Sequence, residues 1–84
     1  MTRDEIERVF TRALLDIAPD ADTSSLGPEA SLRDELDIDS MDLLALARRL
    51  HEALGVTIPE RDYVHIDSLR GAVDYLAAAL SARG

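Results

Sequence analysis

Amphipathic stretches with helical spacing alternate with polar stretches along the chain. In the first stretch an apolar residue recurs every three or four positions, as on one face of a helix. The residues of this face are Ile6, Val9, Phe10, Ala13, Leu14 and Ile17. Thr2 and Glu5 have the spacing of an N-terminal capping box, and Pro19 disfavours helical geometry in the residue before it. The pattern predicts a helix from about Arg3 to Ala18.

The next stretch, from Pro19 to Ile38, is rich in Asp, Ser, Thr, Gly and Pro. Its apolar residues are spaced too irregularly for a long helix. They are Leu26, Leu32, Leu36 and Ile38. We expect a long loop, held against the core by these apolar side chains. Ordered loops of this length in compact domains are usually functional.

A second helix is predicted to begin at Asp39 and Ser40 and to end before Gly55. Its apolar positions again recur at intervals of three and four. They are Met41, Leu44, Ala47, Leu50 and Leu54, and Leu43 and Leu46 widen this face. Gly55 suits the left-handed conformation that often follows the end of a helix.

The remaining segment predicts one short helix and one long helix. Pro59 favours the first position of a short helical turn over Glu60 to Val64. Ser68 is expected to cap a last helix that ends at Arg83 and Gly84. The apolar face of that helix contains Leu69, Ala72, Val73, Leu76 and Leu80.

Three long helices and one short helix predict an all-α four-helix bundle with a long first loop. A chain of 84 residues has room for one domain, so we expect residues 1–84 to form a single domain. The chain contains no cysteine, which excludes disulfides, thiolate zinc sites and thiol nucleophiles. Its stability must therefore come from packing.

The charge of the chain narrows the choice of partners. Its net charge is -8, from 17 acidic and 9 basic residues, and every basic residue is arginine. We expect no nucleic-acid partner, because phosphate binding needs a basic patch and stacking needs aromatic residues, of which there are few. Basic partner surfaces fit better, although an acidic surface that only keeps the protein soluble explains the charge equally well.

No apolar run approaches the roughly 18 residues of a membrane-spanning helix, and the N-terminus has no apolar segment of a signal peptide. We therefore expect no membrane partner, a cytoplasmic location and a monomer.

The sequence does not predict an enzyme. The only histidines are His51 and His65. Ser40 and His51 share one predicted helix and would lie roughly 16 Å apart along its axis, too far for a catalytic pair. Ser68 lies near His65 in sequence, but so small a bundle shows no deep site.

A metal site is not predicted either. The segment from Asp20 opens like a calcium-binding loop, but Ser25 occupies the position of the glycine and Ser31 that of the bidentate glutamate. The carboxylates around Ser40 are expected to form a solvated acidic face.

The start of the second predicted helix offers a specific chemistry. If Asp39 accepts the free N–H groups of the first turn, the Ser40 hydroxyl is released from local bonding and faces solvent. A phosphodiester on Ser40 would then lie at the positive end of the helix dipole, which favours an anion. The alternative is that Ser40 is itself the cap. The same Asp-Ser pair also occurs at Asp67 and Ser68, so this short motif does not decide whether Ser40 is modified or is only a helix cap.

A wider pattern supports the first interpretation. The segments Ala30-Ser31-Leu32, Glu35-Leu36 and Ile38-Asp39-Ser40-Met41-Asp42 resemble the attachment region of acyl carrier proteins. The resemblance continues without a gap through the following segments. They are Leu44, Leu46, Leu50, Ile58-Pro59, Ile66, Ser68-Leu69 and Ala72-Val73-Asp74-Tyr75-Leu76.

The resemblance implies that Ser40 carries a 4′-phosphopantetheine arm, which a phosphopantetheinyl transferase adds from coenzyme A. The thiol of the arm would hold acyl groups as thioesters for acyl-loading and acyl-processing enzymes. Ser68 matches the position that caps the last helix of the family. The residues expected to be recognised by the transferase and other partners are Asp39, Met41, Asp42, Ala45 and Arg48.

In the family an acyl chain can enter between the helices, and this resemblance assigns the lining of such a pocket. The matching positions are Leu50, Ile58, Tyr63, Ile66 and Ala72. Tyr63 is bulky for its position. If it points inward it fills the pocket and favours short or polar cargo; the alternative is that it lies over the surface with its hydroxyl in water.

Departures from the family pattern bear on the cargo and the pathway. The chain lacks the Gly-Gly-His-Ser motif of peptidyl carriers, which favours an acyl load, whereas D-alanyl carriers also use Asp-Ser-Met and leave an aminoacyl load open. Asp37 replaces a frequent glycine but tolerates a positive φ better than most residues.

The alternative to a working carrier is a relative that has lost its arm and acts as a helical protein-interaction module.

The second helix is less acidic than in familiar fatty-acid carriers, because it contains Arg48, Arg49 and His51. This favours a dedicated pathway, such as a polyketide or other specialised one. The alternative is that the arginines only stabilise the helix by pairing with Glu52 at three- and four-residue spacing.

Overall fold

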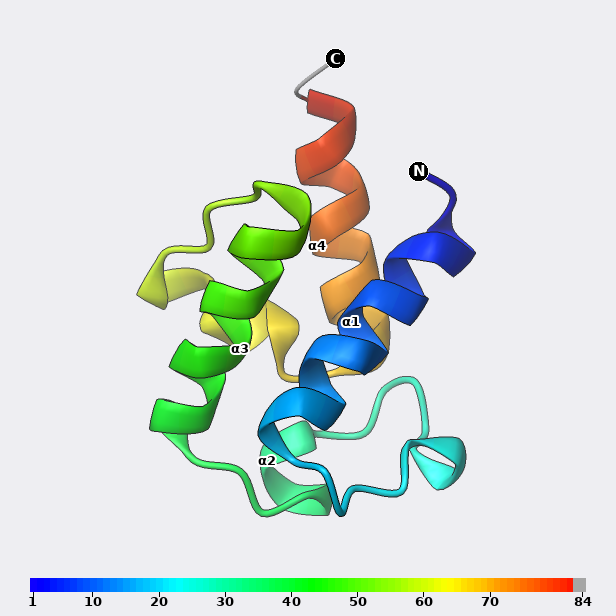
Figure 1. Cartoon of the computed structure of the whole chain (residues 1–84), viewed down its shortest axis with the longest axis vertical. Coiled ribbons are helices and arrows are strands. Elements are labelled where there is room, and N and C mark those ends of the chain that lie inside the picture. The colour runs from blue at the N-terminus through cyan, green and yellow to red at the C-terminus, as the bar shows by residue number, and fades with distance from the viewer. Residues whose placement is uncertain (83–84) are drawn as a thin grey trace.

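The computed structural model describes residues 1–82, and every regular element in that part of the chain is a helix (Figure 1). This confirms the predicted all-α bundle with three long helices. The elements are α1 Arg3–Ile17, η1 Thr23–Ser25, α2 Leu32–Glu35, α3 Ser40–Leu54, η2 Glu60–Ile66 and α4 Leu69–Ala82. The predicted end of the last helix, at Arg83 and Gly84, lies outside the described residues.

The ends of the helices follow the local sequence. Thr2 and Glu5 form the predicted capping box, in which the Glu5 N–H donates to the Thr2 hydroxyl and the Thr2 N–H donates to the Glu5 carboxylate. After α3, Gly55 has a φ of 70°, the left-handed conformation expected there. The Gly71 N–H donates to the Ser68 hydroxyl at 3.0 Å, which confirms Ser68 as the cap of α4.

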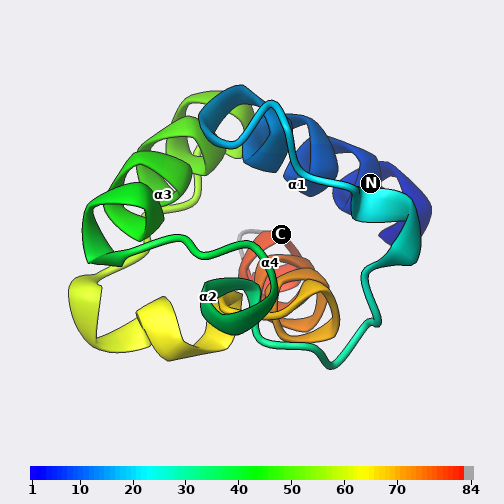
Figure 2. The ribbon, with the colours of Figure 1, turned by 90° about the horizontal axis from the view of Figure 1, so that it is seen from below.

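The core lies between the apolar faces of the long helices. Helix α1 packs against both α3 and α4, and η2 joins α3 to α4 on the remaining side (Figures 1 and 2). Within residues 1–82 every polar and charged residue is at least partly exposed. The largest fully buried side chains are Ile6, Phe10, Leu14, Leu32, Leu46, Leu50, Ile66 and Leu76.

The predicted loop from Pro19 to Ile38 contains two short helices that the sequence pattern did not predict, η1 and α2. Helix α2 has only four residues, so its apolar spacing is too short to recognise. Ser31 caps it locally, and Asp67 contacts it from the distant junction before α4. The local pattern does not reveal this short turn, because several of the hydrogen bonds that hold it come from Asp67, far along the chain.

The loop is fixed to the start of α4 by hydrogen bonds. The Asp67 carboxylate accepts from the Ser31 hydroxyl at 2.7 Å and from the Arg33 N–H at 3.0 Å. The Leu32 N–H donates to the Asp67 carbonyl at 2.8 Å, and the Arg70 N–H donates to the Pro28 carbonyl at 2.8 Å. These bonds hold α2 beside the start of α4, where it closes the end of the bundle (Figure 2).

The short predicted helix is present but differs in length and type. It was expected from Glu60 to Val64, and it is a 3-10 segment, η2, that extends to Ile66. The extension buries Ile66 completely. No helix within residues 1–82 has both the length and the apolar character needed to cross a membrane.

Candidate attachment site

The turn that enters α3 fixes where this helix begins. Asp37 has a φ of 55°, so the left-handed conformation considered for this position is present. Ile38 follows and is buried, with 6% of its surface exposed. Because its side chain is fixed in the core, the next residue, Asp39, is held at the end of the helix.

Asp39 caps α3 through a reciprocal pair of hydrogen bonds. The Asp42 N–H donates to the Asp39 carboxylate at 3.0 Å, and the Asp39 N–H donates to the Asp42 carboxylate at 3.2 Å. Two backbone donors of the helix start are thus satisfied by carboxylates. This confirms Asp39 as the cap and overturns the alternative in which Ser40 has that role.

Ser40 is the first residue of α3 and is exposed. In residues 1–82 its hydroxyl makes no hydrogen bond, and the N–H groups of Ser40 and Met41 have no acceptor. These two donors lie at the positive end of a 15-residue helix. A phosphate ester on Ser40 therefore fits this position, because free amides and the helix dipole both favour its negative charge.

The other serines differ from Ser40. Ser24 and Ser25 donate to Asp22, and Ser31 donates to Asp67 at 2.7 Å. Ser68 accepts the Gly71 N–H. The sixth serine, Ser81, is exposed but lies near the C-terminal end of α4, where the helix dipole disfavours an anion.

The residues expected to be recognised by partners surround Ser40 and continue along one side of α3. Asp39 and Arg48 are exposed, Asp42 and Ala45 are half-buried, and Met41 has 69% of its surface exposed. An exposed methionine offers an adaptable apolar contact. Three of these residues line one shallow groove: Met41, Ala45 and Arg48.

The arginines of α3 do not pair with Glu52. Arg49 instead reaches Asp16 of α1 at 3.5 Å, and neither Arg48 nor Arg49 lies within 4 Å of the Glu52 carboxylate in the described chain. The alternative in which both arginines only form intrahelical pairs is therefore wrong. Arg48 remains exposed beside the Met41 groove.

The residues assigned to an acyl pocket fall into two groups. Leu50, Ile66 and Ala72 lie inside the core and are 0% exposed. Ile58 and Tyr63 line a groove of about 330 Å³ between α3 and η2. Tyr63 is half-buried there and packs against the core, so its effect on cargo length stays a prediction.

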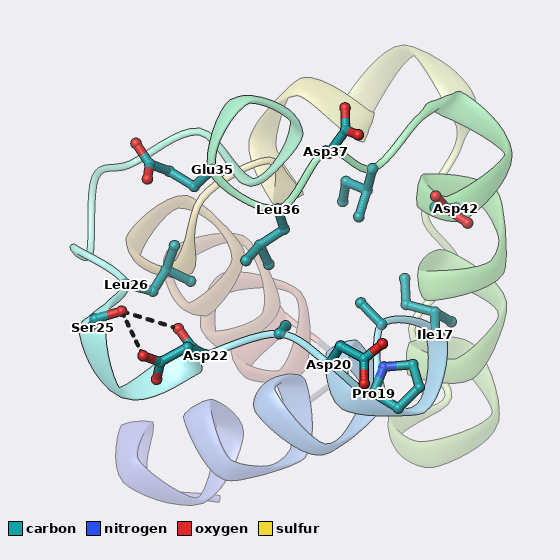
Figure 3. A pocket seen from close by; sticks show the side chains of 13 residues that line it. Ile17, Pro19, Asp20, Asp22, Ser25, Leu26, Glu35, Leu36, Asp37 and Asp42 are labelled. Atoms are coloured by element: carbon teal, nitrogen blue, oxygen red, sulfur yellow. Dashed lines mark hydrogen bonds between the residues drawn. The ribbon is translucent and has the colours of Figure 1, made fainter.

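A second hollow lies between the end of α1 and the loops on either side of α2, and the sequence pattern did not predict it (Figure 3). It has a volume of about 540 Å³. Apolar and acidic side chains both line it: Ile17, Leu26, Leu36, Ile38, Asp20, Asp22, Glu35, Asp37 and Asp42. Within residues 1–82 no group of three His, Cys, Asp or Glu side chains is arranged to hold a metal ion.

Known proteins match both the sequence and the fold. The family described as a phosphopantetheine attachment site matches residues 3–76. An acyl carrier protein of Rubrobacter xylanophilus is 44% identical over 55 residues, which cover 66% of this chain and 68% of that protein. An acyl carrier protein of Myxococcus xanthus is 33% identical over 58 residues, covering 69% and 73%.

The solution structure of the acetyl actinorhodin acyl carrier protein from Streptomyces coelicolor has the same fold. Its TM-score is 0.70 at 28% identity, across 100% of this chain and 95% of that one. The fold and site thus define a carrier with a phosphopantetheine attachment site. The chain belongs to the acyl carrier protein family. Its prosthetic group is a covalently attached 4′-phosphopantetheine, and its class consists of carriers and not catalysts.

Proposed function

We propose that Ser40 carries the 4′-phosphopantetheine arm, and that residues 1–84 form one carrier domain that holds acyl intermediates as thioesters. One observation above all supports this assignment. Ser40 combines an exposed, unbonded hydroxyl with two free backbone N–H groups at the start of a long helix. Four of the other five serines are engaged in hydrogen bonds, and Ser81 lies at the wrong end of its helix.

The attachment step also needs a base that accepts the hydroxyl proton of Ser40. Ser40 must lose its hydroxyl proton when it becomes a phosphate ester, and no side chain in residues 1–82 accepts a hydrogen bond from it. Asp39 and Asp42 are engaged with backbone N–H groups. We therefore expect the transferase to supply the base that takes this proton.

We propose a dedicated, polyketide-like pathway as the setting for this carrier. Arg48 and His51 are exposed on α3, so the helix after the attachment site presents basic groups. The similar Streptomyces protein is an actinorhodin carrier in its acetyl form, which accords with this choice. An aminoacyl load, as in D-alanyl carriers, remains the alternative.

The proposed partners are a phosphopantetheinyl transferase and the enzymes that load and process the acyl group. Their docking would use the side chains around Ser40, chiefly Asp39, Met41 and Asp42, with Ala45 and Arg48 further along α3. The cytoplasmic location expected from the sequence stays a prediction.

An intact-mass measurement tests the attachment site. After incubation with coenzyme A and a broad-specificity transferase, the chain should gain the mass of one phosphopantetheine. The gain should vanish in Ser40→Ala and persist in Ser68→Ala and Ser81→Ala, which are matched serine controls. Circular dichroism should show that Ser40→Ala keeps its helices, because the hydroxyl makes no bond that the fold needs.

The same experiment separates the proposal from its rival. An unmodified mass in the wild-type chain, with a known carrier modified in the same tube, would contradict the proposal. That result would favour a helical interaction module that lacks the arm.

A further inference from the structure

A shallow groove lies between α1 and α3, away from the attachment end of the bundle. We call it the α1–α3 groove, and its volume is about 460 Å³. Its lining consists of Arg8, Val9, Arg12, Ala13 and Asp16 of α1, with Arg49, Glu52 and Ala53 of α3. The two helices lie side by side in both views of the ribbon (Figures 1 and 2).

The charge of this groove is opposite to that of the whole molecule. The chain has a net charge of -8 and nine basic residues, yet the lining combines three arginines with only two carboxylates. Arg12 and Arg49 share one of these carboxylates, that of Asp16, at 3.8 and 3.5 Å. Arg8 lies within 4 Å of no carboxylate in the described chain.

The guanidinium groups of the groove keep most of their bonding capacity. The Arg12 side chain is 82% exposed, so its contact with Asp16 is a solvated surface pair that contributes little. Each guanidinium has five N–H donors and binds carboxylates in a planar, bidentate way. An incoming carboxylate can therefore be bound without any existing ion pair being broken.

The floor of the groove is apolar and made of small side chains. Val9 is half-buried, Ala13 is buried and Ala53 is exposed, so the floor is shallow and close to the helix backbones. Such a surface between two helices accepts the ridge of side chains of a third helix. One or two leucine-sized side chains spaced four residues apart would cover the floor, and acidic residues beside them would face the arginines.

We propose that the α1–α3 groove is a docking surface for an acidic amphipathic helix of a partner protein. The local excess of three arginines over two carboxylates in the lining selects an acidic occupant, and the apolar floor between two helices fits a helix. Arg49 lies nine residues after Ser40, about 14 Å further along α3. A partner seated in the groove would leave the hydroxyl of Ser40 accessible.

The test uses the isotope-labelled full chain and a synthetic helical peptide. The peptide carries leucine at positions four residues apart, with glutamates on both sides of them. A matched peptide has lysine in place of every glutamate. The amide signals of Val9, Ala13 and Ala53 should shift with the acidic peptide and not with the basic one.

Charge variants then test the arginines. Arg8→Glu combined with Arg12→Glu should weaken binding of the acidic peptide about tenfold or more. The control is Arg33→Glu combined with Arg61→Glu, which changes the net charge equally at exposed arginines outside the groove. This control should leave the affinity within about twofold. The Ser40→Ala chain should bind as the parent does, which separates this proposal from the attachment site.

Several results would overturn the proposal. They are signal shifts confined to the Met41 end of α3, equal binding of both peptides, and equal losses in the two double variants. Binding of vesicles with anionic lipid at the same amide signals would assign the surface to a membrane instead. Shifts of these signals with protein concentration alone would assign it to a second copy of this chain.

Discussion

At the scale of single residues, the proposed attachment site depends on a division of roles between Asp39 and Ser40. Asp39 satisfies the backbone N–H of Asp42, which leaves the Ser40 hydroxyl without a local partner. A serine that capped its own helix would be bonded to the backbone and unavailable for esterification. The carboxylate of Asp39 thus positions the reactive group without touching it.

Replacing Asp39 with alanine should lower the free energy of unfolding by about 1 kcal/mol, because the cap of α3 is lost. Urea denaturation measures this change. Asp39→Asn is the matched control and should retain most of the stability, since asparagine caps helices about as well as aspartate. Equal stability of Asp39→Ala and the parent would contradict the role of the cap.

Gly71, whose N–H is bonded to the Ser68 hydroxyl, also allows η2 to pack closely against α4. A Cβ atom at this position would lie 2.8 Å from the Ser68 hydroxyl oxygen, and closer still to the carbonyl oxygen of His65. A backbone carbonyl cannot move aside as the end of a flexible side chain can. The third position of α4 is therefore restricted to glycine by the approach of the preceding segment.

Gly71→Ala should destabilise the protein by about 1 to 3 kcal/mol through overpacking. Ordinary helix propensity predicts the opposite sign, because alanine is favoured over glycine by about 1 kcal/mol. The control is Gly27→Ala, where a Cβ would meet only the Ala30 side chain at 3.9 Å. Thermal unfolding of the two variants decides the matter, and a Gly71→Ala protein as stable as the parent would refute the steric argument.

The sequence predicts some of these residues and not others, according to the range of their contacts. The Asp39–Asp42 and Thr2–Glu5 pairs each span three residues, so their spacing is visible in the sequence. The restriction at Gly71 depends on the path of η2 and has no pattern of its own. The pairing of Arg49 with Asp16 spans 33 residues, and for that reason the shorter spacing to Glu52 was misleading.

At the scale of elements, the long amphipathic helices could be predicted and the short ones between residues 19 and 38 could not. Helices α1 and α3 have 15 residues each, enough for a repeated apolar face and a recognisable start. Helix α2 has one turn, and Asp67, which is 36 residues from Ser31, accepts three hydrogen bonds from this helix and its cap. Such stabilisation appears only when the chain is folded.

The contact between η2 and α4 contains a titratable group. The Tyr75 hydroxyl donates to the Asp62 carboxylate at 2.8 Å, and the Tyr75 ring stacks on His65 with centroids 5.7 Å apart. Burial raises the pKa of Tyr75 above its usual 10.0, and the hydrogen bond to Asp62 raises it further, since both favour the neutral phenol. The contact is therefore sensitive to alkaline pH.

Because the pKa of Tyr75 is raised on folding, its contribution to stability should be complete below about pH 10 and be lost as the pH rises through the folded pKa. In a Tyr63→Phe background Tyr75 is the only tyrosine, and its ultraviolet absorbance reports its ionisation directly. Its titration midpoint should fall when Asp62 is replaced by asparagine or when urea unfolds the chain. An unchanged midpoint in both cases would contradict the view that burial and Asp62 raise the pKa of Tyr75.

At the scale of the whole molecule, charge is distributed unevenly. Five carboxylates line the hollow between the end of α1 and the loops around α2, whereas three arginines line the α1–α3 groove. The net charge of -8 acts at longer range than either surface and should steer the carrier toward basic docking patches. Groups close to Ser40 would then determine the final orientation.

The rate constant for modification by a transferase with a basic docking surface should fall as salt is raised. The Debye length shortens from about 10 Å at 0.1 M to about 3 Å at 1 M, which screens the steering. Asp34→Asn combined with Glu35→Gln removes two exposed carboxylates of α2 that make no hydrogen bond through their side chains in the described chain. The rate constant for modification of this variant should depend less on salt than that of the parent. A rate constant that does not change with salt in either protein would contradict the steering.

The most direct test of the attachment site locates the arm on the chain. The protein is modified with coenzyme A and a broad-specificity transferase, cleaved with a protease and analysed by fragmentation mass spectrometry. We predict that the phosphopantetheine is found on Ser40 alone. Its presence on Ser68, Ser81 or any other residue, or on none while a known carrier is modified alongside, would contradict the central claim.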